Sequence, residues 1–325
     1  MATYKGIQGY TVQKLSSAPP GAQSVGQLWY NSTAGTFKIG TEGSGAWSAG
    51  TAMNQVRAEC GYARAGTLTA GLLFAGDAPG AGYLVECEEF NGTAWTEKND
   101  LNTSRSGTGG LGTSTAAMCI SGNTTDDSNK CEEWNGTCWA ETGDIASKSQ
   151  NIFGAGTTSA GISASGSAGA AAQTYNGSTW TLVNSVNSPR AAGGSVGLQT
   201  TALIYSGGPP GVTTELYDGT CWAEQNDVNA ARAQIGSGFG SPTAAMLAGG
   251  NTPGDSRMTE CEIYDGTCWS ETGDLSVGVR MGGGGGTTSS GFNAGGHPAS
   301  APPAETNACE IWANPVYNIK TVTVS

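Results

Sequence analysis

The stretch Tyr217-Asp218-Gly219-Thr220-Cys221-Trp222 contains the pattern that decides the fold of this chain. An aromatic residue precedes an Asp-Gly turn, and a tryptophan follows the aromatic residue by five positions. Asp-Gly and Asn-Gly adopt positive φ at little cost, so they close tight hairpins between two antiparallel strands. The same arrangement recurs at Phe90 to Trp95, Trp134 to Trp139, Tyr175 to Trp180 and Tyr264 to Trp269.

The repeated tryptophans define a period. They are separated by 41 to 48 residues along most of the chain. A period in the forties with one aromatic hairpin per unit is typical of the blades of a β-propeller. The series reads Trp47, Trp95, Trp139, Trp180, Trp222 and Trp269.

Further features fall into register with each tryptophan. An apolar residue follows it by six positions, then a basic residue, then a Gly-rich stretch and a short apolar run that ends in Gly. We interpret each unit as four short strands, of which the innermost is Gly-rich because side chains would collide at the axis. The basic residues are Arg57, Arg105, Arg190, Arg232 and Arg280, with Lys148 in the third unit.

The ends of the repeat indicate how the ring closes. Trp47 has no upstream repeat of its own, whereas the last unit has an aromatic strand at Trp312 but no repeat tryptophan after it. Joining the two gives six complete blades, with the segment near Trp47 as the outer strand of the last one. This closure removes open sheet edges. We therefore predict an all-β, six-bladed propeller over residues 45–314.

Residues 1–44 differ from the repeats, and we expect them to form an N-terminal attachment arm. Leu28 to Ile39 alternates as a hairpin would, with its turn at Ala34-Gly35. Trp29 and Tyr30 are candidate attachment residues, and Trp29 either packs the arm or anchors a partner subunit. Residues 315–325 are β-branched and alternating, so we expect a strand that pairs with the arm or with another copy.

Composition narrows the partners. The net charge is −12 and no Lys/Arg cluster offsets it, so we expect no binding to nucleic acid phosphates. The N-terminus shows no apolar signal core, and no run approaches 18 apolar residues, so we expect neither secretion nor membrane insertion.

Two cysteine pairs, Cys131/Cys138 and Cys261/Cys268, share a seven-residue spacing. We interpret them as small buried thiols, because a diagonal placement across a hairpin suits a disulfide poorly.

The order of Arg, apolar run with Gly-Gly, aromatic hairpin and Trp resembles the kelch repeat from about residue 46 to 312. The unit that ends in Tyr217 to Trp222 and continues Val228 to Arg232 is similar to kelch-like proteins of marine and cyanobacterial phages. Gly26 to Ile39 also resembles the N-termini of phage fibre and appendage proteins. The resemblance implies a virion structural protein on a tail or another host-facing appendage.

The repeated residues have two interpretations each. A ring of arginines could bind a carboxylated glycan, or each arginine could tie one blade to the next through backbone carbonyls or a glutamate such as Glu86, Glu132, Glu215, Glu260 or Glu310. The tryptophans could stack on sugars or fill the core. The Asn-Gly sequons are interpreted as turn chemistry, and Asp126 to Asn129 as a solvated loop rather than a calcium site.

We expect no enzyme, no cofactor and no metal. Kelch-type copper oxidases need two histidine ligands and this chain has only His297, which also excludes a His-rich zinc site. The resemblance favours a non-enzymatic virion protein, assembled in the host cytoplasm, that presents the propeller for adhesion to a host receptor or glycan and binds other virion proteins and copies of itself. Alternatives are a capsid or tail cement protein, a cellular kelch-type interaction module or lectin, and a hydrolase with carboxylates in an axial pocket.

Overall fold

The computed structural model describes residues 13–19, 27–43, 45–209, 211–299, 305–314 and 316–322. Every regular element in these ranges is a strand, and none of them contains a helix that is long and apolar enough to cross a membrane. The chain divides into two compact units, 1–45 with 314–325, and 46–313. The predicted arm and tail thus belong to one unit.

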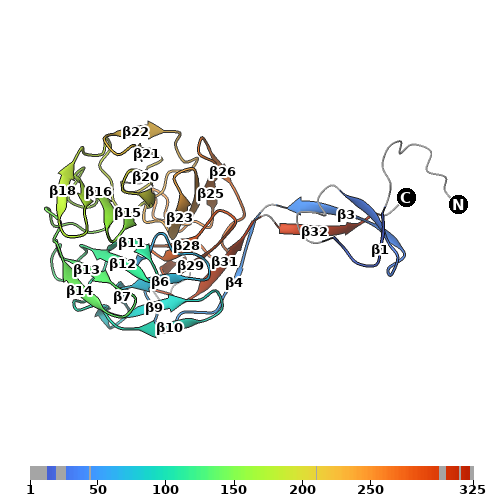
Figure 1. The fold of residues 1–325 in the computed structure, drawn as a ribbon, viewed down its shortest axis with the longest axis horizontal. Helices are drawn as coiled ribbons and strands as arrows, with labels where there is room; N and C mark the ends of the chain where they lie inside the picture. The colour runs from blue at the N-terminus through green and yellow to red at the C-terminus, as the bar shows by residue number, and fades with distance from the viewer. Residues whose placement is uncertain are drawn as a thin grey trace. The chain divides into compact units, whose positions relative to one another are not determined.

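Six four-stranded antiparallel sheets make up the larger unit, and Figure 1 shows them arranged around a common axis. The first strand of each sheet packs beside the first strand of the next, so these strands surround the axis. The all-β propeller prediction is confirmed, and the six sheets are consistent with six blades. The sheets, from the axis outward, are β5 (Gly61–Tyr62), β6 (Gly71–Phe74), β9 (Cys87–Phe90) and β10 (Trp95–Lys98); β11 (Gly109–Thr113), β12 (Ala116–Ile120), β13 (Cys131–Trp134) and β14 (Trp139–Thr142); β15 (Phe153–Thr157), β16 (Ala160–Ala164), β17 (Ala172–Tyr175) and β18 (Trp180–Val183); β19 (Gly194–Leu198), β20 (Thr201–Tyr205), β21 (Thr214–Tyr217) and β22 (Trp222–Gln225); β23 (Ser237–Ser241), β24 (Ala244–Ala248), β25 (Cys261–Tyr264) and β26 (Trp269–Glu271); and β28 (Gly283–Gly286), β29 (Ser290–Ala294), β31 (Cys309–Ala313) and β4 (Ala46–Ala49).

In five of the six sheets the two outer strands form the hairpin that the sequence predicts. Tyr217 lies directly opposite Trp222, and between them Gly219 adopts a φ of 94°. The Asp218 carboxylate accepts hydrogen bonds from the amides of Thr220 and Cys221, at 2.8 Å each. Those bonds lower the pKa of Asp218 and fix the turn.

Glycine is required on the innermost strands. A Cβ at Gly110 would lie 2.2 Å from the carbonyl oxygen of Tyr62 on the neighbouring sheet. No side chain fits there, so the backbones of adjacent inner strands approach closely.

The hydrophobic core lies between neighbouring sheets. Phe74 of the first sheet contacts Trp139 of the second, with ring centroids 4.9 Å apart, and Phe90 contacts Phe292 of the sixth at 5.2 Å. The apolar residues that follow each tryptophan by six positions are all buried here: Met53, Leu101, Ile145, Val186, Val228 and Leu275.

The N-terminal side of the chain closes the ring. Strand β4 pairs with β31, so Trp47 lies directly opposite Trp312, with ring centroids 5.3 Å apart. The outer strand of the last sheet therefore comes from the beginning of the chain, as the sequence predicts.

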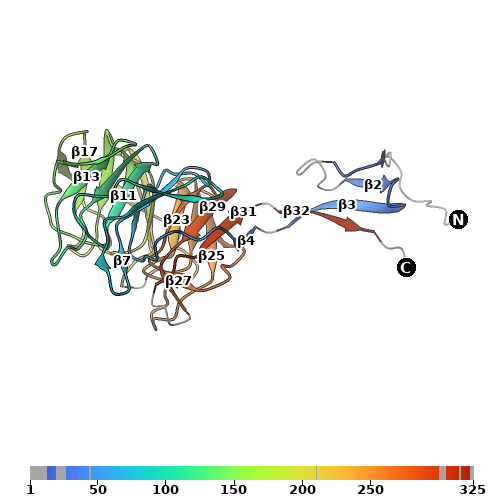
Figure 2. The same ribbon diagram turned by 90° about the horizontal axis from the view of Figure 1, so that it is seen from below.

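Two short two-stranded sheets add to this pattern; the first is a hairpin between the second and third strands of the first sheet, and the second pairs the segment before β28 with the segment after β29. They are β7 (Asp77–Ala78) with β8 (Gly82–Tyr83), and β27 (Val279–Arg280) with β30 (His297–Pro298). In side view, β7 and β27 lie on the same face of the ring (Figure 2).

The smaller unit is one sheet in the order β1 (Gln13–Leu15), β2 (Leu28–Asn31), β3 (Thr36–Gly43) and β32 (Val316–Thr321). Strands β2 and β3 form the expected hairpin, with Asn31 opposite Thr36. Strand β32 pairs antiparallel with β3, so the C-terminal strand joins the arm of its own chain.

Candidate functional site

Four of the repeated arginines form buried ion pairs. Arg57, Arg105, Arg190 and Arg232 lie 2.6 to 2.8 Å from Glu88, Glu132, Glu215 and Glu262. Each arginine is on the segment that enters a sheet, and its glutamate is on the third strand of that sheet. The pair therefore fixes the connection between one blade and the next, and these four guanidinium groups do not form an exposed ring.

Two of the glutamates named from the sequence have a different role. Glu86 and Glu260 offer backbone carbonyls to Arg57 and Arg232, at 2.7 and 2.6 Å. The carboxylates come from Glu88 and Glu262, two positions later, which lie on the third strands β9 and β25, whereas Glu86 and Glu260 immediately precede those strands.

The third and sixth sheets depart from this pattern. In the third, Lys148 is exposed, and Gln173 replaces the glutamate and accepts a hydrogen bond from the amide of Ala146. In the sixth, Arg280 pairs with Asp255 at 2.6 Å, and Glu310 accepts from the amide of Ser276 instead. Glu310, one of the glutamates that the sequence suggested as an arginine partner, therefore has no ion pair with Arg280.

The repeated tryptophans pack in the core. Trp95, Trp139, Trp222 and Trp269 are buried, and Trp47 and Trp180 are half-buried. The Trp95 indole N–H donates to the carbonyl of Thr51 at 2.9 Å, so this ring also fixes the connecting segment. The geometry fits the core interpretation rather than stacking on sugars.

A closed circle of backbone hydrogen bonds surrounds one end of the axis. Each sheet contributes one residue just before its first strand, and each of these residues has a φ between 48° and 60°. The backbone amide at this position donates to the carbonyl of the corresponding residue in the preceding sheet, at 2.6 to 3.2 Å. In the fifth sheet the donor is the amide of Ile235. The six residues are Glu59, Gly107, Asn151, Ala192, Gln234 and Met281.

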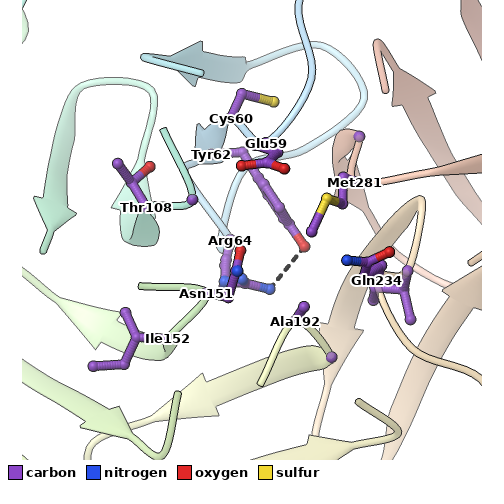
Figure 3. Close-up of a pocket in the computed structure, with 14 residues that line it drawn as sticks. Glu59, Cys60, Tyr62, Arg64, Thr108, Asn151, Ile152, Ala192, Gln234 and Met281 are labelled. Carbon is purple, nitrogen blue, oxygen red and sulfur yellow. Dashed lines mark hydrogen bonds between the residues drawn. The ribbon is translucent and has the colours of Figure 1, made fainter. Parts of the chain in front are cut away.

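Behind this circle the axis is filled. Figure 3 shows Glu59, Asn151, Gln234 and Met281 around a shared space, with Arg64 and Tyr62 behind them. The Tyr62 side chain extends from β5 of the first sheet to β23 of the fifth. Its hydroxyl donates to the carbonyl of Gly238 at 3.2 Å and accepts from Arg64 at 2.7 Å. The cavity measures about 50 Å³, which holds a few water molecules or a small ion but no sugar.

Arg64 is the unusual charge in this cavity. It is 8% exposed, and it forms no ion pair among the described residues. Its guanidinium lies 4.4 Å from the centroid of the Tyr62 ring, which favours a cation in a poorly hydrated place.

Next to the circle, Glu59, Asp77 and His297 form a group whose ligand atoms all lie within 4.8 Å of one another. Burial and the nearby Glu59 carboxylate raise the pKa of Asp77. Its two carboxylates and one imidazole could bind a metal ion, and among the described residues it is the group of His, Cys, Asp and Glu side chains close enough to do so. No spacing in the sequence predicts this group, because its residues come from the first and the sixth repeat.

The candidate attachment residues lie in the arm sheet. Trp29 on β2 is 1% exposed, so it packs within its own unit. Tyr30 is half-buried, and its ring lies 5.3 Å from that of Phe37. The Asn31 carboxamide accepts from the amides of Thr33 and Ala34, as a turn residue does.

The cysteines are free thiols. Cys131 and Cys261 are buried, whereas Cys138 and Cys268 are exposed. The expectation of buried pairs is thus wrong for one partner of each, because that cysteine lies in the exposed turn before the tryptophan. Burial raises the pKa of the Cys131 thiol to about 11 and that of Cys261 to about 12.

Comparison with known proteins supports the fold. No family model and no curated protein sequence matches the chain. The solved structure titled "Structure of YjhT" matches with a TM-score of 0.67 and 11% sequence identity, covering 83% of this chain and 99% of that chain. At this identity the similarity shows the fold alone, which is that of a kelch-like β-propeller.

Proposed function

We propose that this chain is a non-enzymatic structural protein of a phage virion, a tail-fibre or appendage component. In this proposal the arm attaches the chain to the particle and the propeller presents loops to a host receptor or glycan. The resemblance of Gly26 to Ile39 and of the repeats to phage proteins suggests the setting.

The arm carries the proposal. Strands β1 to β3 and strand β32, from opposite sides of the propeller in the sequence, form one small sheet of their own. Strand β32 is at an edge of that sheet, and on it Ile319 is 48% exposed. An edge strand with apolar side chains is a template for pairing with another chain, so it suits attachment to a neighbouring subunit.

The axis supports a binding scaffold over an enzyme. A substrate pocket commonly measures 300–1,000 Å³, whereas the cavity at the mouth measures about 50 Å³. Tyr62 and its hydrogen bonds to Gly238 occupy the space in which a substrate would bind. Contacts with a host surface would then use the loops on the faces of the ring.

Particle incorporation tests the attachment. We expect wild-type chain to co-purify with virions, and Ile319→Lys to lower incorporation at least about tenfold, because a lysine on an edge strand blocks pairing. Leu182→Lys is the matched control, since Leu182 is an exposed apolar residue on an outer strand of the propeller. Wild-type protein that never associates with particles would overturn the proposal.

Binding of the purified, labelled chain to host cells tests adhesion separately. Saturable binding supports the host-facing role. A chain that enters particles but binds no cell would be a capsid or tail cement protein instead.

A further inference from the structure

The group Glu59, Asp77 and His297 lies where the first and last sheets meet. Glu59 precedes β5 and Asp77 begins β7, both in the first repeat, whereas His297 is on β30 after β29 of the sixth. The two segments are already in contact: the amide of Gly296 donates to the carbonyl of Arg57 at 2.8 Å. Ring closure therefore brings together three side chains from opposite ends of the repeat array.

The two carboxylates of this group have no lysine or arginine partner in the described part of the chain. Carboxylate oxygens of Glu59 and Asp77 lie within 4.8 Å of each other, and neither residue has an ion pair with Lys or Arg among those found in the described residues. Two carboxylates at this separation repel unless a proton or a cation lies between them.

A third carboxylate strengthens the argument independently. Glu305 is 7% exposed, and its Oε1 lies 3.7 Å from Nδ1 of His297. Its other oxygen, Oε2, is buried and has no hydrogen-bond partner among the described residues, and neither has Oδ1 of Asp77. Buried carboxylate oxygens without donors are costly, and a cation bound by Asp77 would satisfy its Oδ1.

From this geometry we propose that Glu59, Asp77 and His297 bind one divalent transition-metal ion, with Zn²⁺ as the best match, and that the ion clasps the first blade to the last. Two carboxylates and an imidazole are a donor set that Zn²⁺ accepts, with water completing the coordination. Glu305 lies against the imidazole in the manner of the carboxylates that orient metal-bound histidines.

A metal ion bound by Glu59, Asp77 and His297 would stabilise the contact between the first and sixth sheets. The other blade connections have buried Arg–Glu pairs or, in the third sheet, Gln173. In the sixth sheet Arg280 leaves that position for Asp255, and the backbone of Arg280 pairs with that of His297. His297 thus connects this altered segment of the sixth sheet to Glu59 and Asp77 of the first sheet, whose own entering segment keeps the Arg57–Glu88 pair. The clasp is independent of whether the chain attaches to a virion.

Zinc titration of the full chain tests the site. The protein is freed of any tag, treated with chelator, and alkylated at its exposed thiols Cys138, Cys221 and Cys268, which would otherwise bind zinc. We expect one equivalent of Zn²⁺ to bind, and Asp77→Asn and His297→Gln each to weaken binding at least about tenfold. Asp126→Asn, on an exposed loop of another sheet, is the matched control and keeps wild-type affinity.

His297 provides a direct reporter because it is the only histidine of the chain. Its imidazole proton resonances should shift on saturation with Zn²⁺ in the wild type and in Asp126→Asn. Zinc that binds without moving them, or with equal affinity in all variants, would overturn the site, as would the absence of stoichiometric binding.

Melting temperatures separate metal binding from a purely structural role. Zn²⁺ at about 100-fold above its dissociation constant should raise the wild-type melting temperature by roughly 5 °C. With chelator present, Asp77→Asn should melt no lower than wild type, since the substitution removes an uncompensated charge, and Zn²⁺ should not raise its melting temperature. Equal destabilisation of this variant with and without Zn²⁺ would contradict the clasp.

Discussion

The buried ion pair between Arg105 and Glu132 makes the strongest prediction about stability. The Glu132 carboxylate accepts from Arg105 at 2.7 Å, from the Asn102 amide and side chain at 2.7 and 2.9 Å, and from the Thr103 amide at 3.2 Å. Both side chains are nearly inaccessible. Glu132→Ala would leave a buried guanidinium without its counter-ion, which costs about 3–5 kcal/mol.

The third sheet supplies a matched control. Gln173 occupies the corresponding place, is also buried, and accepts from the amide of Ala146 with no arginine nearby in the repeat pattern. Gln173→Ala should therefore cost only about 1–3 kcal/mol, the cost of an unsatisfied neutral donor.

Denaturant unfolding measures both differences, and the melting temperature of Glu132→Ala should fall by roughly 5–9 °C. If Glu132→Ala is no more destabilising than Gln173→Ala, then the ion pair does not fix the blade connection and the reasoning is refuted.

Three further predictions concern the ring and its thiols. Gly110→Ala should lower the free energy of unfolding by about 1–3 kcal/mol, because the new Cβ would lie 2.2 Å from the backbone oxygen of Tyr62. Gly254→Ala is the control and should be tolerated, since the nearest atom to its Cβ would be 3.8 Å away. Equal unfolding curves for the two variants would contradict the close approach of the inner strands. In native protein near pH 8, three of the nine cysteines should react quickly with a thiol reagent and all nine should react in denaturant, since the other six are buried and burial raises the pKa of thiols such as Cys119 to about 12; more than three fast equivalents would contradict the packing. A chain that begins after residue 50 lacks β4 and should unfold at lower denaturant than a chain that begins at residue 45; equal midpoints would count against closure by β4.

The fold could be predicted because its signals are local and repeated. The Asp-Gly or Asn-Gly turn, the aromatic residue before it and the tryptophan after it lie within six residues, and this pattern recurs in five of the six blades. Closure could also be predicted, because a strand missing at one end of the chain matched a surplus strand at the other.

The sites could not be predicted from the same pattern. Arg280 and Glu310 occupy repeat positions, yet Arg280 lies one residue out of register and pairs with Asp255 on a neighbouring loop. The group of Glu59, Asp77 and His297 depends on contacts between residues about 240 apart in the chain, which ring closure creates and no spacing encodes. The crossing of the axis by Tyr62 is likewise a property of the assembled ring.

Hydrogen exchange of the full-length chain tests ring closure most directly. The backbone amides of β4, Ala46–Ala49, should exchange as slowly as those of β14, Trp139–Thr142, which is the corresponding outer strand of the second sheet. Exchange of β4 at the rate of an exposed loop, while β14 stays protected, would mean that the beginning of the chain does not complete the last sheet and would contradict the account.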